Sequence, residues 1–150
     1  AVLYAVPQVS VDFNAISRSH LELIRSWMSF YNEHRERMFA GEFELLSDDP
    51  HYSAARISSG GRTYLPCFLE DWPAGLPVRS SDAGTIILFN GSDKPRIATR
   101  LEGITGSYRF KATDMFHKPA GKGVTVKSAG NALTLDHPVA IGGMAYLTRT

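Results

Sequence analysis

Two carboxylates and a tryptophan stand together at residues 70–72, in a stretch that otherwise reads as loop. A carboxylate beside an aromatic ring can bind a sugar, because sugar hydroxyls bond to the carboxylate while the sugar ring stacks on the aromatic face. Glu70, Asp71 and Trp72 are therefore the first candidates for a carbohydrate site. Pro73 follows directly, and a tryptophan at such a place more often closes the edge of a β-sandwich, which is the interpretation we favour.

Catalytic and metal-binding patterns are weaker. Asp48 and Asp49 are adjacent, whereas a glycosidase needs two carboxylates that face each other across the sugar. The five histidines do not pair at metal-ligand spacing, and the one cysteine, Cys67, has no neighbouring histidine to activate it as a nucleophile. Glycine-rich stretches at 58–61 and 121–123 lack the spacing of a phosphate-binding loop. We therefore predict no catalytic residue and no metal site.

The composition is that of one globular domain, or of one domain with a piece of another. The 150 residues are 43% hydrophobic and 21% charged, and no apolar run is long enough to span a bilayer. The net charge is only +1, which argues against a broad surface for nucleic acid. With a single cysteine no internal disulfide can form, which favours a cytoplasmic location without fixing it.

One long helix is expected from about Ser19 to Ala40. Ser19 followed by Glu22 fits a capping box, and Gly41 stands where a helix C-cap often takes a positive φ. Apolar residues recur at helical spacing and form a stripe along one side of the helix: Leu21, Ile24, Trp27, Met28, Tyr31 and Met38. Trp27, Phe30 and Tyr31 are expected to lie in the core. If a neighbouring domain is missing, part of this stripe would lie exposed and favour self-association of the chain.

After residue 41 the apolar period changes from helical to two. About eight short strands follow, separated by turn residues, with Gly60 and Gly61 forming a two-residue hairpin turn. This spacing is typical of an antiparallel β-sandwich or barrel. One of these strands is expected at 107–113, with Tyr108 and Phe110 on the same side. We therefore predict a mainly β chain with two regions, a strand and helix at 1–41 and an antiparallel β-sandwich at 42–150.

The first region is too small to have a core of its own. Residues 2–6 and 8–13 read as strand, and one strand with one helix cannot bury a core. The simplest explanation is that they close a (β/α)8 barrel whose remainder precedes Ala1, although removal of an initiator methionine would also leave alanine first. Asp12 would then lie at the rim where barrel enzymes bind substrate, but a loop cap is the interpretation we favour.

Residues 3–46 resemble the end of the catalytic barrel in the melibiase (α-galactosidase) clan of glycoside hydrolases. The last strand of that barrel runs into a loop with an aspartate, then into a helix with a phrase resembling FYxxHRxxxxxGxFxxL. Here the phrase begins at Phe30 and ends at Leu46, with His34 and Arg35 in its middle. A β-sandwich follows in that family, and its last strand resembles the segment 138–147.

The resemblance implies a non-catalytic C-terminal region whose sandwich stabilises the catalytic barrel of the same protein. The parent enzyme would cleave α-galactosidic or similar α-glycosidic bonds with two carboxylates and no cofactor. Those carboxylates lie on earlier barrel strands, so no catalytic residue is carried over to this sequence. The implied partners are the barrel and, through the parent enzyme, a carbohydrate; neither nucleic acid nor a membrane is expected.

Two alternatives remain open. A stand-alone carbohydrate-binding module would dock glycans through a row of exposed aromatic residues, for which the sequence offers Trp72, Tyr64, Tyr52 and Tyr108. A complete small β-domain used for protein–protein contact would instead pack the helix across the sandwich. Alternation alone does not say which face of each strand points outward.

Overall fold

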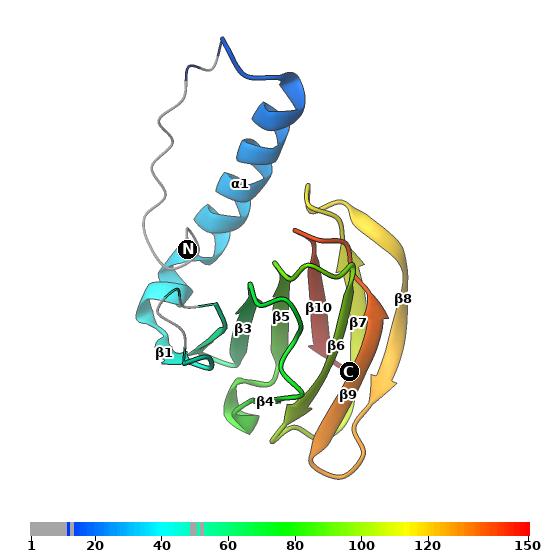
Figure 1. The fold of residues 1–150 in the computed structure, drawn as a ribbon. Coiled ribbons are helices and arrows are strands. Elements are labelled where there is room, and N and C mark those ends of the chain that lie inside the picture. Colours follow the sequence, from blue (N-terminus) through cyan, green and yellow to red (C-terminus); the bar gives the residue numbers. More distant parts are fainter. Residues whose placement is uncertain (1–11, 13, 49–50, 52) are drawn as a thin grey trace.

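The computed structural model describes residues 12, 14–48, 51 and 53–150, and within them the chain is mainly β. One α-helix precedes ten strands (Figure 1). Their bounds are α1 (Arg18–Ala40), β1 (Glu42–Leu45), β2 (Ala55–Ser59), β3 (Arg62–Cys67), β4 (Gly75–Pro77), β5 (Thr85–Asn90), β6 (Arg96–Glu102), β7 (Ser107–Thr113), β8 (Pro119–Lys127), β9 (Ala132–Pro138) and β10 (Met144–Arg149). A short 3-10 helix, η2 (Ser80–Asp82), lies between β4 and β5.

The described strands form a β-sandwich. Sheet A has seven strands in the order β1-β2-β3-β5-β10-β7-β8, and sheet B has three in the order β4-β6-β9. Apolar side chains from both sheets meet in one core, which we call the sandwich core. Its fully buried members come from both sheets and include Leu65, Ile86, Leu88, Leu147, Ile97, Leu101, Leu133 and Leu135. The mainly β sandwich preceded by a helix is therefore confirmed.

Two strand pairs depart from the antiparallel expectation. β3 pairs with β5, and β4 pairs with β6, in parallel. The physical reason is the connection between β3 and β5, which crosses to sheet B, contributes β4 there and returns through η2. Because this connection brings the chain back to the end where β3 began, β5 runs in the same direction; the Thr85 amide donates to the Gly61 carbonyl at 3.1 Å.

The helix differs from its sequence prediction at both ends. It begins at Arg18, and its N-cap is Ser17, whose hydroxyl accepts from the His20 amide at 3.3 Å. Gly41 is not left-handed, since its φ is −79° and the chain passes directly into β1. Glycine is needed there for space, because an added Cβ would lie 2.8 Å from Ile57 Cγ2 and 3.0 Å from the Arg37 carbonyl oxygen.

Several local predictions are confirmed. The turn at Gly60 and Gly61 has φ values of 53° and 80° at these two residues, which is why glycine occupies both positions. β7 spans the residues expected from its alternation, with Tyr108 and Phe110 facing the sandwich core. The predicted strands at 2–6 and 8–13 fall outside the described residues except for Asp12.

The helix lies against the outer face of sheet A (Figure 1). Its first half contacts the turn between β7 and β8, where the Ser26 hydroxyl donates to the Phe116 carbonyl at 2.6 Å and Glu22 pairs with Lys118. Its C-terminal end leads into β1 at the opposite edge of the sheet. α1 therefore crosses the sheet diagonally and leaves part of the outer face uncovered.

Candidate functional site

The seam between α1 and sheet A holds a second apolar core, which we call the helix–sheet core. Its buried members are Phe30, Tyr31 and Met38 on the helix and Ile57, Tyr64, Ile87 and Met144 on four strands of the sheet. These strand residues alternate with the ones that enter the sandwich core, so sheet A is apolar on both faces where the helix covers it. The buried placement predicted for Phe30 and Tyr31 is confirmed, while Trp27 is only half-buried.

A polar cluster lies inside this seam, and we call it the His34 cluster: His34, Arg62, Tyr64 and Glu33. The His34 side chain lies in the seam and only 3% of the residue is exposed. Its Nδ1 lies 3.1 Å from the Tyr64 hydroxyl and 3.1 Å from Arg62 Nη1. Because a guanidinium only donates hydrogen bonds, Nδ1 must accept, so the ring proton sits on Nε2, which faces Glu33 Oε1 at 3.6 Å.

Burial favours the neutral form of this histidine. Desolvation lowers the pKa of His34 below 6.5, Arg62 and Arg37 add to the lowering, and Glu33 opposes it. Burial likewise raises the pKa of Tyr64, and it raises the pKa of Tyr146 nearby to about 12. Both phenols therefore stay protonated near neutral pH, and the cluster joins helix to sheet without supplying a reactive nucleophile.

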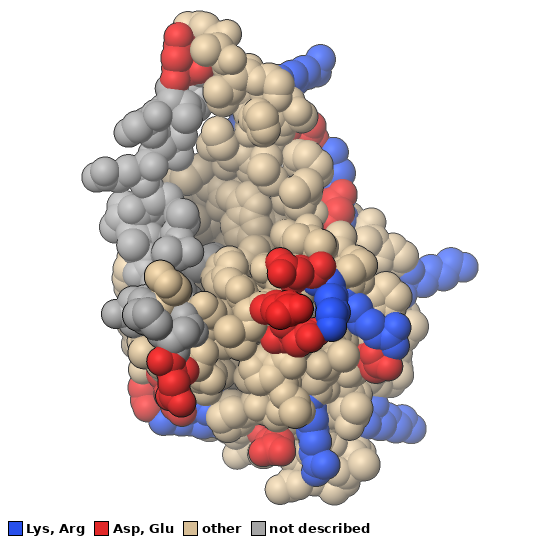
Figure 2. Space-filling model, viewed as in Figure 1, with Lys and Arg blue, Asp and Glu red and all other residues tan. Residues whose placement is uncertain are grey.

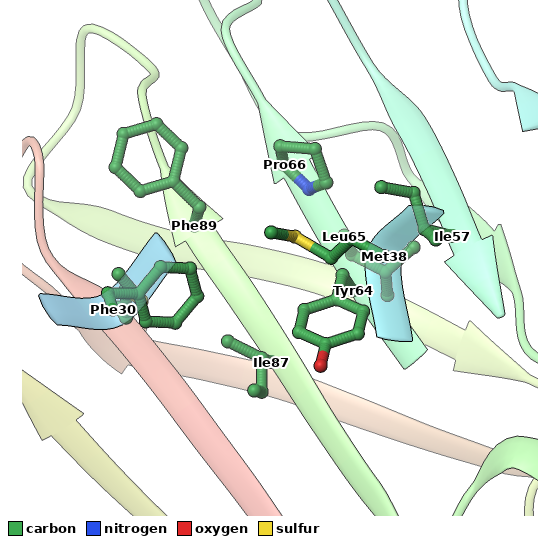
Figure 3. A pocket seen from close by; sticks show the side chains of 9 residues that line it. Phe30, Met38, Ile57, Tyr64, Leu65, Pro66, Ile87 and Phe89 are labelled. Atoms are coloured by element: carbon green, nitrogen blue, oxygen red, sulfur yellow. The ribbon is translucent and has the colours of Figure 1, made fainter. Parts of the chain in front are cut away.

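A small pocket opens beside the His34 cluster (Figure 3). It encloses about 300 Å³ of empty space, counted with its open mouth, and its lining is almost wholly apolar. Phe30 and Met38 reach into it from the helix, and Tyr64 and Ile87 face them from the sheet (Figure 3). Small-molecule sites carry a few polar groups that orient the ligand. Here the Tyr64 hydroxyl is already bonded to His34, so no such group is left among the lining residues.

Aromatic rings continue from the pocket along the first half of the helix. Trp27 makes edge contacts with Phe30, Phe89 and His117, with ring centroids 5.9, 5.1 and 4.6 Å apart. His117 has a positive φ of 60°, and its Nε2 is buried without a partner. Burial lowers the pKa of His117, which fits its apolar surroundings. These contacts hold the β7–β8 turn against the helix.

The carboxylates predicted to bind carbohydrate are exposed, but they do not come together in one site. Asp71 pairs with Lys94, with Oδ2 2.7 Å from Nζ, and the Lys94 pKa is raised first by this hydrogen bond and to a smaller extent by Glu70. Glu70 lies on the surface beside them. Asp12 lies ahead of the helix, where its Oδ1 accepts from the Asn14 amide at 2.9 Å, as in the loop cap that we favoured. The described contacts of Asp12 do not join it to the loop at 70–72.

Trp72 belongs to the sandwich core. It is 8% exposed, and its indole Nε1 donates to Asn90 Oδ1 at 3.0 Å. Tyr64 and Tyr108 are 4% and 0% exposed, under the helix and inside the sandwich respectively. These three residues therefore cannot form a row of exposed rings, and Tyr52 lies outside the described residues.

Asn90 is the residue that sequence reasoning missed. It is fully buried at the end of β5, and its Oδ1 accepts from Trp72 Nε1 and from the Ser92 hydroxyl at 2.6 Å. Its Nδ2 donates to the carbonyls of Lys94 and Val139 at 2.9 and 2.8 Å. The pair Asn90-Gly91 reads as a turn in the sequence, so nothing there indicated that the amide joins three separate segments.

Metal and thiol chemistry find no support in the described part of the chain. No group of three or more His, Cys, Asp or Glu side chains there could hold a metal ion. Cys67 is buried, and burial raises the pKa of its thiol, which disfavours the reactive thiolate. Among the described helices none is long and apolar enough to cross a membrane.

Charge and shape on one face of the molecule are shown in Figure 2. A hollow in the upper part of this view is uncharged on its described side. Acidic and basic side chains sit next to each other beside it, in keeping with the salt bridges among the described residues. The fold and the site thus define a β-sandwich with a docked helix. Searches of protein families, curated proteins and solved structures found no match to this chain.

Proposed function

We propose that this chain is the non-catalytic C-terminal accessory region of a glycoside hydrolase resembling the melibiase clan. In this role the sandwich and α1 support a catalytic barrel that belongs to the parent protein. The carbohydrate would be bound and cleaved by that barrel.

The observation that carries the proposal is the uneven burial of α1. The second half of the helix buries Phe30, Tyr31, His34 and Met38 against sheet A. The first half is just as apolar, but none of its large apolar side chains is fully buried: Leu21, Leu23, Ile24, Trp27 and Met28. Phe39, near the end of the helix, is 58% exposed. A helix with this pattern is suited to contact a second body, because incompletely buried apolar surface favours association.

Three exposed carboxylates of the described chain are held ionised by bonded cations. A glycosidase acid must hold its proton near neutral pH, which requires a raised pKa. The described carboxyl groups with shifted pKa values are Glu22, Glu42 and Asp136, and all three are lowered by a bonded cation, Lys118, Arg79 and Arg96 respectively. Each is therefore held in the ionised form, which is the opposite of what a general acid needs.

The reading frame upstream of Ala1 tests the origin of the chain. We expect it to encode further βα units with two carboxylates at strand ends facing the barrel axis. The purified chain should not hydrolyse 4-nitrophenyl α-galactoside. A frame without such units, or hydrolysis by the chain alone, would overturn the proposal.

A second experiment tests the supporting role. Adding the chain to the separately produced barrel should raise the barrel's melting temperature by at least about 5 °C, since a ligand that binds only the folded state stabilises it. Ile24→Asp and Phe39→Asp should remove this effect. Val124→Asp is the matched control, because Val124 is 42% exposed on β8 at the far edge of sheet A.

The same preparation separates this proposal from a carbohydrate-binding module. Migration of the chain in a gel that contains galactomannan should equal its migration in a gel without polysaccharide. Retardation by the neutral polysaccharide, together with no effect on the barrel, would favour the module instead.

A further inference from the structure

The net charge of +1 conceals an uneven distribution of charge over sheet A. The adjacent strands β3, β5, β10, β7 and β8 contain no aspartate or glutamate. Their basic residues are Arg62, Arg149, Arg109, Lys111, Lys122 and Lys127. The carboxylates of the described strands lie elsewhere, on β1, β6 and β9.

Strand register places two of these cations, Arg62 and Arg109, in one row with three threonines on the outer face of the sheet. Arg62 is paired with Thr85, Thr85 with Thr148, Thr148 with Arg109 and Arg109 with Thr125. Their chain neighbours Ile86, Leu147 and Phe110 point into the sandwich core, so the row points outward. We call these five residues the cationic row.

The helix contacts this row at Arg62, whose Nη1 lies 3.1 Å from His34 Nδ1, and leaves the row members on β10, β7 and β8 exposed. The helix–sheet core reaches sheet A at Tyr64, Ile87 and Met144, which lie toward the other end of the same strands. Arg109, Thr125 and Thr148 are exposed, and Arg62 and Thr85 are half-buried. Lys111 and Lys127 are exposed on the same face and flank the row.

Apart from Arg62, which is bonded to His34, the cations of this face are free to meet a ligand. Within the described residues no carboxylate forms a salt bridge with Arg109, Lys111 or Lys127. Gly123 lies beneath two of them, since a Cβ there would be 2.9 Å from Arg109 Nε and 3.1 Å from Lys111 Cγ. The missing side chain at residue 123 gives the stems of both residues room to lie along the sheet toward the β8 edge.

We propose that this uncovered part of sheet A binds an acidic polysaccharide, a chain of sugars that carries carboxylate or sulfate groups. Lys127 pairs with Ser107 on the neighbouring strand, so with about 3.3 Å per residue and about 4.8 Å between strands it lies about 14 Å from Lys111. This spacing suits anionic groups repeated along an extended polymer. Between them on this face stands Arg109, and paired with it on the neighbouring strands are Thr125 and Thr148, whose hydroxyls make no described hydrogen bond and can pair with sugar hydroxyls.

A single-stranded nucleic acid fits this face less well. Such ligands depend on aromatic rings on which successive bases stack. The described aromatic residue beside the row is Tyr146, which is half-buried in the helix–sheet core and whose hydroxyl donates to Met144 Sδ at 3.5 Å. The face therefore offers charge and hydroxyl groups without a stacking platform. This inference does not depend on the proposed accessory role, because it rests on Arg109, Lys111 and Lys127 and not on α1.

The test measures binding of the full chain to polygalacturonate, with neutral galactan and oligo-deoxythymidine as competing probes, over a range of salt concentrations. We expect binding to polygalacturonate that weakens as salt rises, little binding to galactan and weaker binding to the oligonucleotide. The double variant R109Q/K111Q should lose most of the affinity, and its slope of log K against log salt should fall by about 1–2 units.

The matched control is R96Q/R100Q, which removes the same charge from exposed positions of β6 in sheet B. It should keep the affinity of the native chain, and thermal unfolding checks that both variants are folded. Failure of the native chain to bind polygalacturonate in dilute salt would overturn the proposal. Equal losses in the two double variants would also overturn it, since binding would then follow net charge. Tighter binding of the oligonucleotide would assign the face to a nucleic acid instead.

Discussion

At the scale of single residues, two buried polar groups join parts of the chain that are far apart in sequence. His34 links α1 to β3, and Asn90 links β5 to the loop at 70–72 and to the segment before β10. Both are satisfied by hydrogen bonds, so their burial costs little while the partners remain. Removing either side chain leaves its hydrogen-bond partners unpaired in an environment that water does not reach.

Asn90→Ala should destabilise the protein by about 2–4 kcal/mol, because it leaves the Trp72 indole N–H and two carbonyls without partners. Urea unfolding followed by tryptophan fluorescence measures the loss. The control Asn32→Ala changes an exposed asparagine on α1 and should alter stability by less than about 0.5 kcal/mol. Equal effects of the two variants would mean that the buried amide network contributes nothing specific.

His34 makes the stability of the protein depend on pH. Burial lowers its pKa in the folded state below 6.5, so the unfolded chain binds more protons near that pH. The stability contribution is therefore complete above about pH 6.5 and is lost as the pH falls toward the folded-state pKa. A protonated ring would also place a donor on Nδ1 opposite Arg62 Nη1.

We expect His34→Gln to flatten the fall in unfolding free energy between pH 7.5 and pH 5.5. The remaining slope should come in part from His117, whose pKa burial also lowers. His20→Gln, at an exposed position near the start of α1, is the control and should keep the native slope. If His34→Gln retains the full slope, the seam histidine is not the group that titrates.

At the scale of secondary-structure elements, the sequence predicts what local pattern determines and misses what distant contacts determine. The bounds of β7 follow from alternation, and the body of α1 follows from its apolar stripe. The parallel pairing of β3 and β5 depends on where a long connection crosses, and no local signal encodes that. The predicted sugar site failed to form for a similar reason, since the sequence could not show that Trp72 reaches a buried partner at Asn90.

Gly41 shows within one residue the difference between what local pattern predicts and what distant contacts determine. Its position predicted a left-handed cap, but it is needed because β2 approaches the end of the helix closely. Gly41→Ala should therefore cost about 1–3 kcal/mol from crowding against Ile57, although its φ suits any residue. Gly60→Ala offers a contrast, since no atom lies within 4 Å but its φ is +53°, and it should cost about 1 kcal/mol from strain. Thermal unfolding of both variants checks the two costs, and an unchanged Gly41→Ala would contradict the crowding argument.

At the scale of the whole molecule, three layers share two cores. Sheet A lies in the middle, with sheet B packed on one face and α1 on part of the other. The sandwich core is much the larger, and it contains most of the fully buried side chains. The helix is held by the smaller helix–sheet core, which also contains the open pocket. This division predicts that the helix can be released while the sandwich stays folded.

Phe30→Ala and Leu133→Ala test whether the helix can be released while the sandwich stays folded. Phe30 lies in the helix–sheet core, and Leu133 lies in the sandwich core. Both should cost about 2–5 kcal/mol when the packing that they remove is lost. Hydrogen exchange distinguishes where the loss falls. Phe30→Ala should speed exchange of the amides in α1 and leave those of β6 and β9 protected, whereas Leu133→Ala should speed exchange throughout. If Phe30→Ala raised exchange equally in α1 and β9, the helix and the sandwich would form one cooperative unit, and a barrel could not detach the helix without unfolding the sandwich.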